Sequence, residues 1–207
     1  MRTLLLALLF LVSTSCATST PTTFMMKDLV RLNNEVIQLY IPCSDGVNYV
    51  PKQEGCEPEL LASKAAETMD FSVTFISADV RQAPGYDIYL ATAMIHFRIA
   101  QGTLDEYTLA EQLARQFFEM QKAHSGHSID DARFYWAWFA AASASKQFYE
   151  DPLSLDQDRK ADLLVALGEG MTLLNELEGP RLVRLQQALY VLRFITEAIK
   201  TEHNVVD

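Results

Sequence analysis

Apolar residues recur every three or four positions along most of the chain, a spacing that places them on one face of an α-helix. The first such stripe, within residues 24–40, consists of Leu29, Leu32, Val36 and Leu39. Prolines, glycines and capping residues interrupt the pattern and predict further helix starts near positions 58, 84, 103, 128, 154 and 180. Most of these starts lie about 25 residues apart, which suits a helix of roughly five turns followed by a short connection.

Two of the starts have the spacing of a capping box, in which a Ser or Thr and a Glu or Gln satisfy each other's unpaired backbone amides. They are Thr103 with Glu106 and Ser154 with Gln157. Residues 71–75 are ambiguous, because the sequence Phe-Ser-Val-Thr-Phe alternates and is β-prone. We favour a helix that begins at Pro58 and continues through this segment, with a short strand as the alternative.

The pattern as a whole predicts an all-α fold with about seven helices in one domain, residues 24–207. Short connections make neighbouring helices antiparallel, so we expect a stack of helix hairpins, either a closed bundle or a short solenoid. Residues 88–120 and 134–174 each place an Ala- and aromatic-rich helix before a more amphipathic one. This arrangement is similar in style to tetratricopeptide-like helical repeats, and an unrelated helical bundle is the alternative.

The first fifteen residues have the pattern of a signal peptide. Arg2 precedes an uninterrupted apolar run over residues 4–12, which is too short for a permanent membrane-spanning helix. At Ser13-Thr14-Ser15-Cys16 the segment resembles a bacterial lipoprotein signal. The resemblance implies cleavage before Cys16, lipid on that cysteine and, from Ala17, sorting to the outer membrane. Ordinary secretion with cleavage nearby is the alternative. Residues 16–23 would then form the lipidated end and a short polar tether.

Two cysteines remain if Cys16 carries lipid. Cys43 and Cys56 bracket a loop that contains glycine and proline, and an even pair of this kind in an exported protein predicts a disulfide. Two free thiols are the alternative. In the chain-entropy model a disulfide closing a loop of this size stabilises the fold by about 3 kcal/mol.

The charge balance bears on the class of partner. The chain has 27 Asp and Glu against 17 Lys and Arg, a net charge of -10, which argues against nucleic acid as a partner. The charge is also uneven: the segment 150–178 is largely acidic, whereas the last helix carries Arg181, Arg184, Arg193 and Lys200. Such asymmetry could guide docking to a protein partner.

The densest aromatic segment, residues 133–145, is apolar on two faces of its predicted helix, and such a helix should be central to the fold. Core packing is the first interpretation of its aromatic residues. The alternative is a groove for a peptide or small apolar ligand, and Tyr135, Trp136 and Phe139 are then the residues expected to line it.

Candidate chemistry is sparse. His124, His127 and Asp131 are metal-ligand types and define a metal-dependent enzyme hypothesis, yet the pair of histidines lies in a glycine-containing turn and no HExxH motif is present. No GxSxG motif occurs either. We therefore predict no catalytic residue, no metal and no cofactor.

These observations favour a non-enzymatic lipoprotein of the bacterial envelope. Its lipid on Cys16 would hold it at a membrane, facing the periplasm, and its helices would bind protein partners of a secretion, pilus or transport complex. The assignment to such a complex is an analogy from the predicted fold and localisation. The alternatives are a periplasmic protein that binds a small ligand and, behind it, the metal-dependent enzyme.

Overall fold

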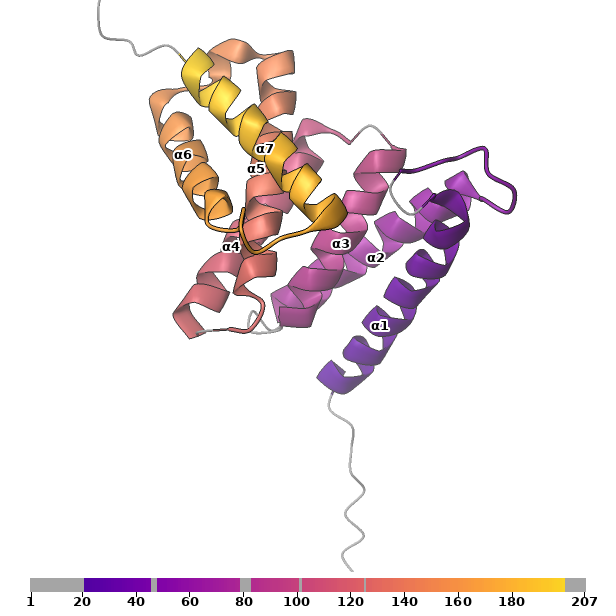
Figure 1. Ribbon diagram of the computed structural model, residues 1–207. Coiled ribbons are helices and arrows are strands. Elements are labelled where there is room, and N and C mark those ends of the chain that lie inside the picture. The colour runs from indigo at the N-terminus through magenta and orange to yellow at the C-terminus, as the bar shows by residue number, and fades with distance from the viewer. Residues whose placement is uncertain (1–20, 46–47, 79–82, 101, 125, 200–207) are drawn as a thin grey trace, which may run out of the picture.

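The computed structural model describes residues 21–45, 48–78, 83–100, 102–124 and 126–199 (Figure 1). Over these residues the chain forms seven α-helices and two short 3-10 turns, with no strand, which confirms the predicted all-α class. The helices are α1 (Pro21–Tyr40), α2 (Pro58–Ala78), α3 (Ala83–Ile99), α4 (Leu104–His124), α5 (Ile129–Glu150), α6 (Gln157–Met171) and α7 (Gly179–Ala198).

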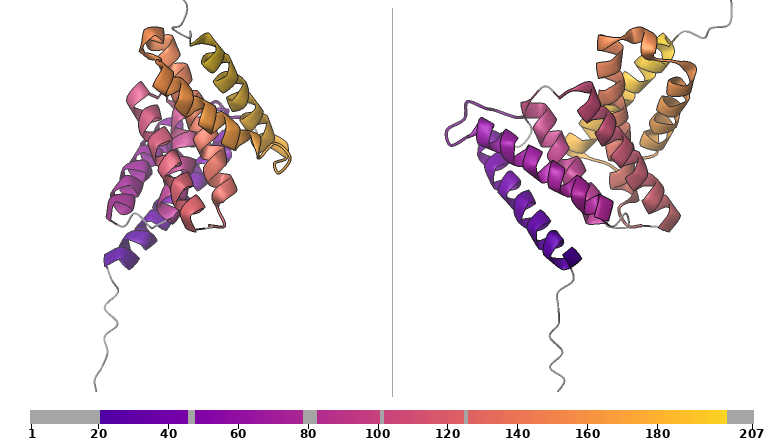
Figure 2. Two further views of the ribbon diagram at one scale, coloured as in Figure 1. Left: turned by 90° about the vertical axis from the view of Figure 1, so that its left-hand side faces the viewer. Right: turned by 180° about the vertical axis from the view of Figure 1, so that it is seen from behind.

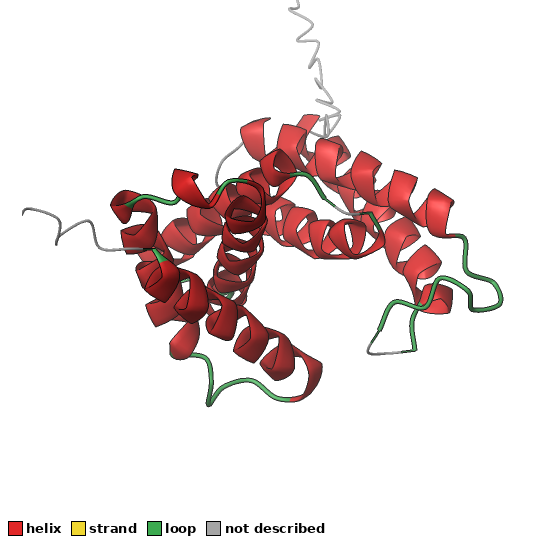
Figure 3. Cartoon of the chain, turned by 90° about the horizontal axis from the view of Figure 1, so that it is seen from above, coloured by secondary structure: helices red, strands yellow, loops and turns green. Residues whose placement is uncertain are grey.

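The helices form two layers. In the first layer α2 packs against both α1 and α3, and in the second α5 packs against α4, α6 and α7. Contact between α3 and α4 joins the layers. Figure 2 shows the helices from the side and from behind. Seen from above, the helices follow an open arc rather than a closed ring (Figure 3). The start of α1 and the end of α7 lie on opposite sides of the molecule (Figure 1).

The N-terminal half differs from the prediction at the start of its first helix and settles the ambiguous segment 71–75. Helix α1 begins at Pro21, so residues 21–23 belong to a helix and not to the predicted tether. The signal peptide, Cys16 and the rest of the tether lie outside the described residues. The ambiguous segment 71–75 is helical within α2. Serine disfavours the interior of a helix. Here the Ser72 hydroxyl donates to the Thr68 carbonyl oxygen of the preceding turn at 2.7 Å, so its polar group is satisfied within the helix.

One predicted capping box is confirmed and the other is wrong. At the start of α4, the Glu106 amide donates to the Thr103 hydroxyl at 3.2 Å and the Thr103 amide donates to the Glu106 carboxylate at 2.6 Å. Helix α6, by contrast, begins three residues after the predicted cap Ser154, because Asp156 caps it by accepting from the Arg159 amide. Ser154 belongs instead to the 3-10 turn Pro152–Ser154.

The main core is continuous from α2 to α7 and is rich in aromatic rings. Phe117, Phe134 and Phe139 are among its largest buried side chains. Gly170 explains how α6 fits against α5 and α7: a Cβ there would lie 2.8 Å from the Ala137 Cβ and 2.9 Å from a Leu189 methyl. Glycine at this position is therefore required for close helix packing.

A partly buried ion pair links α4 to α6 in the second layer. The Arg159 guanidinium on α6 donates two hydrogen bonds, of 2.6 and 2.7 Å, to the Glu111 carboxylate on α4. Arg159 also donates to the Ser143 hydroxyl on the intervening α5, at 3.3 Å. A bidentate pair of this kind adds geometric specificity to a core that is mostly apolar.

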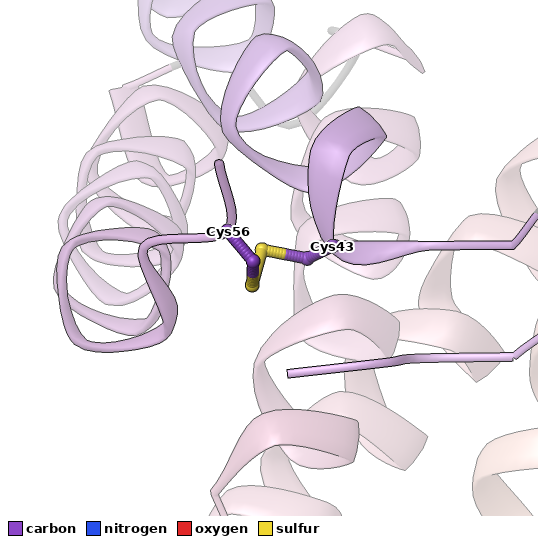
Figure 4. The surroundings of a disulfide bond; sticks show 2 residues. All are labelled: Cys43 and Cys56. Atoms are coloured by element: carbon purple, nitrogen blue, oxygen red, sulfur yellow. A yellow bond between two sulfur atoms is a disulfide. The ribbon is translucent and has the colours of Figure 1, made fainter. Parts of the chain in front are cut away.

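The first layer has a small core of its own, next to the predicted disulfide. Cys43 and Cys56 are bonded, as predicted, and close the loop between α1 and α2 (Figure 4). Cys43 is fully buried with Val36 of α1 and with Leu61 and Ala65 of α2. The disulfide thus reinforces the place where the hydrophobic core is smallest.

A candidate binding cleft along helix α3

The aromatic residues of α5 divide between the core and the surface. Trp136 is 2% exposed and Phe139 fully buried, so both occupy the main core and neither lines a groove. This corrects the groove hypothesis for these two residues and supports the core interpretation. A helix that is apolar all round buries the faces covered by neighbouring helices, and α4, α6 and α7 cover most of α5. Tyr135 alone of the three reaches a cavity.

Tyr135 lies where two cavities meet. Their volumes are about 310 and 290 Å³, and Ala91, Ile95 and Tyr135 line both of them. We call the combined space the α3 cleft. Helix α3 supplies its floor, α1 one wall, and α5 with the start of α7 the other wall. Figure 1 shows α3 in this position, between α1 and α7. The cleft thus lies at the seam of the two layers.

One end of the α3 cleft is acidic. Asp87 of α3 and Asp131 of α5 line the first cavity together with Asn33 and Ile37 of α1. Burial, together with the negative charge of Asp131, raises the pKa of the Asp87 carboxyl to about 6. No basic side chain pairs with Asp87 within the described ranges, whereas Asp131 accepts a 2.6 Å bond from Arg181.

The other end of the α3 cleft is basic. Arg98 of α3 and Arg181 and Arg184 of α7 line the second cavity, alongside Tyr40 of α1. Arg98 donates to the Tyr40 hydroxyl at 3.2 Å. Burial and then the positive charges of Arg98 and Arg181 lower the pKa of the Arg184 guanidinium. In the part of the chain that the structure describes, neither Arg98 nor Arg184 has a carboxylate partner.

Tyr135 separates the two ends. Burial, followed by the negative charge of Asp87, raises the pKa of its phenol to about 12, so the side chain enters the cleft as a neutral hydroxyl. A phenol of this kind can both donate and accept a hydrogen bond. The cleft therefore offers an apolar floor, a neutral polar group at its centre and opposite charges at its ends.

Two other cavities are less suited to binding because most of their charged side chains are already paired with one another. The largest, about 650 Å³, lies on the outer face of α1 and α2, where Glu35 pairs with Arg31 at 2.7 Å and with Lys64 at 3.4 Å. A polar cavity of about 350 Å³ lies over the bidentate pair of Glu111 and Arg159. In the α3 cleft, three of the five charged side chains, Asp87, Arg98 and Arg184, have no ion-pair partner among the described residues.

The described residues do not form the metal site that the enzyme hypothesis requires. Among the described residues, no three His, Cys, Asp or Glu side chains stand close enough together to hold a metal ion. Of its three residues, His124 ends α4, His127 lies in the following turn, and Asp131 is engaged by Arg181.

No protein-family model, curated protein or solved structure matches this chain. Within the described ranges, no helix combines the length and the apolar content needed to cross a bilayer.

Sequence reasoning missed most of the residues that form the α3 cleft. It identified Tyr135 and Asp131 as candidates, and it noted Arg181 and Arg184 as part of a basic last helix. It did not single out Asp87 or Tyr40, and it assigned Arg98 no role of its own. The signal that could have found them is a charged residue within the strongly apolar helix α3, where Asp87 and Arg98 are the only two Asp, Glu, Lys or Arg residues.

Proposed function

We propose that this protein is a lipid-anchored, non-enzymatic subunit of the bacterial envelope that binds a protein partner in the α3 cleft. Lipid on Cys16 would hold it at the outer membrane, facing the periplasm. The helical domain would present the cleft to a component of a secretion, pilus or transport complex. The observation that carries the proposal is the cleft itself, whose opposite ends have charges of opposite sign that no described residue pairs.

The chemistry of the cleft supports binding rather than catalysis. Apolar side chains with a few well-placed polar groups are typical of a recognition site. Charges held at fixed positions in such a site give specificity and orientation to the bound partner. The cleft walls come from four helices of both layers, so a partner segment seated there would also bridge the layers.

The partner interaction can be tested by photocrosslinking in cells. A photoreactive amino acid at Ile37, which is 42% exposed and lines the cleft, should form an adduct with one envelope protein. The same amino acid at Tyr149, which is 91% exposed on α5 outside the cleft, is the matched control. An adduct that forms equally at both positions, or at neither, would contradict binding in the cleft.

The anchor is tested separately. The Cys16→Ser variant should move from the membrane fraction to the soluble fraction, because serine offers no thiol for lipid attachment. Cys43→Ser gives a control that removes a different cysteine. Membrane association that persists unchanged in Cys16→Ser would show that the lipoprotein assignment is wrong.

A periplasmic protein that binds a small ligand is the second candidate, and the size of the cleft supports it. The two cavities together fall within the range of about 300–1,000 Å³ that holds small molecules. Under this alternative a ligand would copurify with the chain, and the Ile37 crosslink to a protein would be missing. Mass spectrometry of the native protein distinguishes the two outcomes.

A further inference from the structure

Three arginines converge on one cavity of a protein whose net charge is -10. They come from two helices that are far apart in the sequence: Arg98 lies near the end of α3, and Arg181 and Arg184 lie in the first two turns of α7. Folding has therefore gathered positive charge in one place although the chain as a whole is acidic.

The two outer arginines of this cluster are held in position. Arg181 is bonded to Asp131 at 2.6 Å and its guanidinium stacks 4.5 Å from the centre of the buried Phe134 ring. Arg98 is oriented by the Tyr40 hydroxyl. Arg184 is half-buried between them and has no hydrogen-bond partner among the described side chains.

This arrangement is unfavourable when nothing is bound. Like charges repel, and the neighbouring arginines contribute to the lowered pKa of Arg184. Arg181 and Arg184 also lie at the positive end of the α7 dipole, where acidic residues would be favoured. A bound anion would relieve both effects, and a guanidinium matches a carboxylate with two parallel hydrogen bonds.

The walls of the cavity indicate what carries the anion. Ala91, Met94 and Ile95 form an apolar floor beside the arginines. A free inorganic anion would gain nothing from these side chains and would be repelled by the net negative charge of the protein. A peptide segment would place apolar atoms on the floor and a carboxylate against the arginines.

We propose that Arg98 and Arg184 bind a carboxylate of the partner protein, at the end of a segment that lies on the apolar floor of the α3 cleft. Arg181 acts as a fixed wall, because Asp131 already neutralises it. This inference rests on the proposed function, since it names the chemistry of the partner segment. It also fixes direction: the carboxylate end of the segment points to α7 and the opposite end to Asp87.

The test uses the full chain, purified in detergent, and four probes. The first probe is an acetylated trileucine peptide with a free C-terminal carboxylate, and the second is the same peptide with a C-terminal amide. The third has a glutamate added before the C-terminal amide, so that its carboxylate is a side chain. The fourth is inorganic phosphate. Titrations are followed by NMR of the arginine Nε–H groups. We expect both carboxylate peptides to shift the Arg98 and Arg184 signals and the neutral amide to leave them unchanged. Equal binding of carboxylate and amide, or binding of phosphate alone, would overturn the proposal.

Matched variants control for folding. Arg184→Gln should weaken binding of the carboxylate peptides at least about tenfold, the usual worth of a charge-assisted hydrogen bond. Arg193→Gln removes an exposed arginine of the same helix outside the cleft and should leave the affinity unchanged. Because Arg184→Gln relieves repulsion, its melting temperature should equal or exceed that of the parent chain. A lower melting temperature, or unchanged affinity, would count against the assigned role.

Failure of this inference can be told from failure of the proposed function. If the Ile37 crosslink forms but no carboxylate peptide binds, the cleft still binds a partner and only the carboxylate assignment falls. If the peptides bind as expected but no crosslink forms in cells, the site is an anion receptor and the partner-binding function falls.

Discussion

The two layers of this protein are stabilised in different ways. The first layer buries a small second core around Val36 and Leu61 and closes it with the disulfide between Cys43 and Cys56. The second layer has no described disulfide; it is held by the main aromatic core, which continues into α2 and α3, and by a partly buried ion pair. A covalent link thus occurs where apolar burial is least, which is the pattern expected when a small core alone gives little stability.

The comparison matters for function because the α3 cleft lies at the seam. Tyr40 and Arg98 reach it from the first layer, and Tyr135 and Arg184 from the second. A change that loosens either layer would move half of the binding residues relative to the other half. The predictions below test how independent the layers are, beginning with the largest expected effect.

Phe139→Ala tests the second layer. Removing a fully buried ring from the aromatic core should lower the free energy of unfolding by about 4 kcal/mol, through lost burial and the cavity that remains. Urea denaturation followed by circular dichroism measures the change. Tyr149→Ala, at a side chain that is 91% exposed, should change stability by less than about 0.5 kcal/mol. Similar losses for the two variants would mean that the α5 aromatics do not form the main core.

Cys43→Ser with Cys56→Ser tests the first layer. Loss of the disulfide should lower the free energy of unfolding by about 3 kcal/mol, because the unfolded chain is no longer constrained. Hydrogen exchange should accelerate in α1 and the start of α2 more than in α5, since α5 packs in the separate main core. Equal acceleration in α1 and α5 would show that the layers unfold as one unit.

Thr103→Ala tests the junction, since Thr103 caps the helix that follows the first layer. Loss of the reciprocal bonds with Glu106 should lower the free energy of unfolding by about 1 kcal/mol. Thr74→Ala is the control, because Thr74 is exposed within α2 and alanine favours a helix interior. A control variant that loses as much stability as Thr103→Ala would rule out capping as the cause.

Asp87→Asn tests the acidic end of the cleft by its pH dependence. The folded-state pKa of about 6 lies above the unfolded value of about 3.9, so the folded protein binds this proton more tightly. The stability from this proton is complete below about pH 4 and is lost as the pH rises through about 6. The melting temperature of Asp87→Asn should therefore change less with pH between these two values, and at neutral pH it should be higher than that of the parent chain. Asp158→Asn, at an exposed carboxyl on α6, leaves Asp87 in place and should retain the slope.

Local features of the sequence predicted the helices well because their causes are local. The spacing of Leu29, Leu32 and Val36 defines one face of α1 whatever packs against it, and all three are buried. The start of α4 follows from two residues three positions apart. The start of α6 was mispredicted because two local signals competed: Asp156 caps the helix, and Pro152 places Ser154 in a separate turn.

The α3 cleft could not be predicted from any short segment of the sequence, because it forms where helices from distant parts of the chain pack together. The sequence by itself determined the all-α class and the approximate helix starts, because periodicity and capping act over short distances, and it predicted the pairing of Cys43 with Cys56. Only the tertiary structure decided that Trp136 and Phe139 are fully enclosed and Tyr135 only partly buried, since that depends on which faces of α5 other helices cover. It alone brought Asp87, Arg98 and Arg184 to one cleft, because charges from distant helices meet only when the layers pack together.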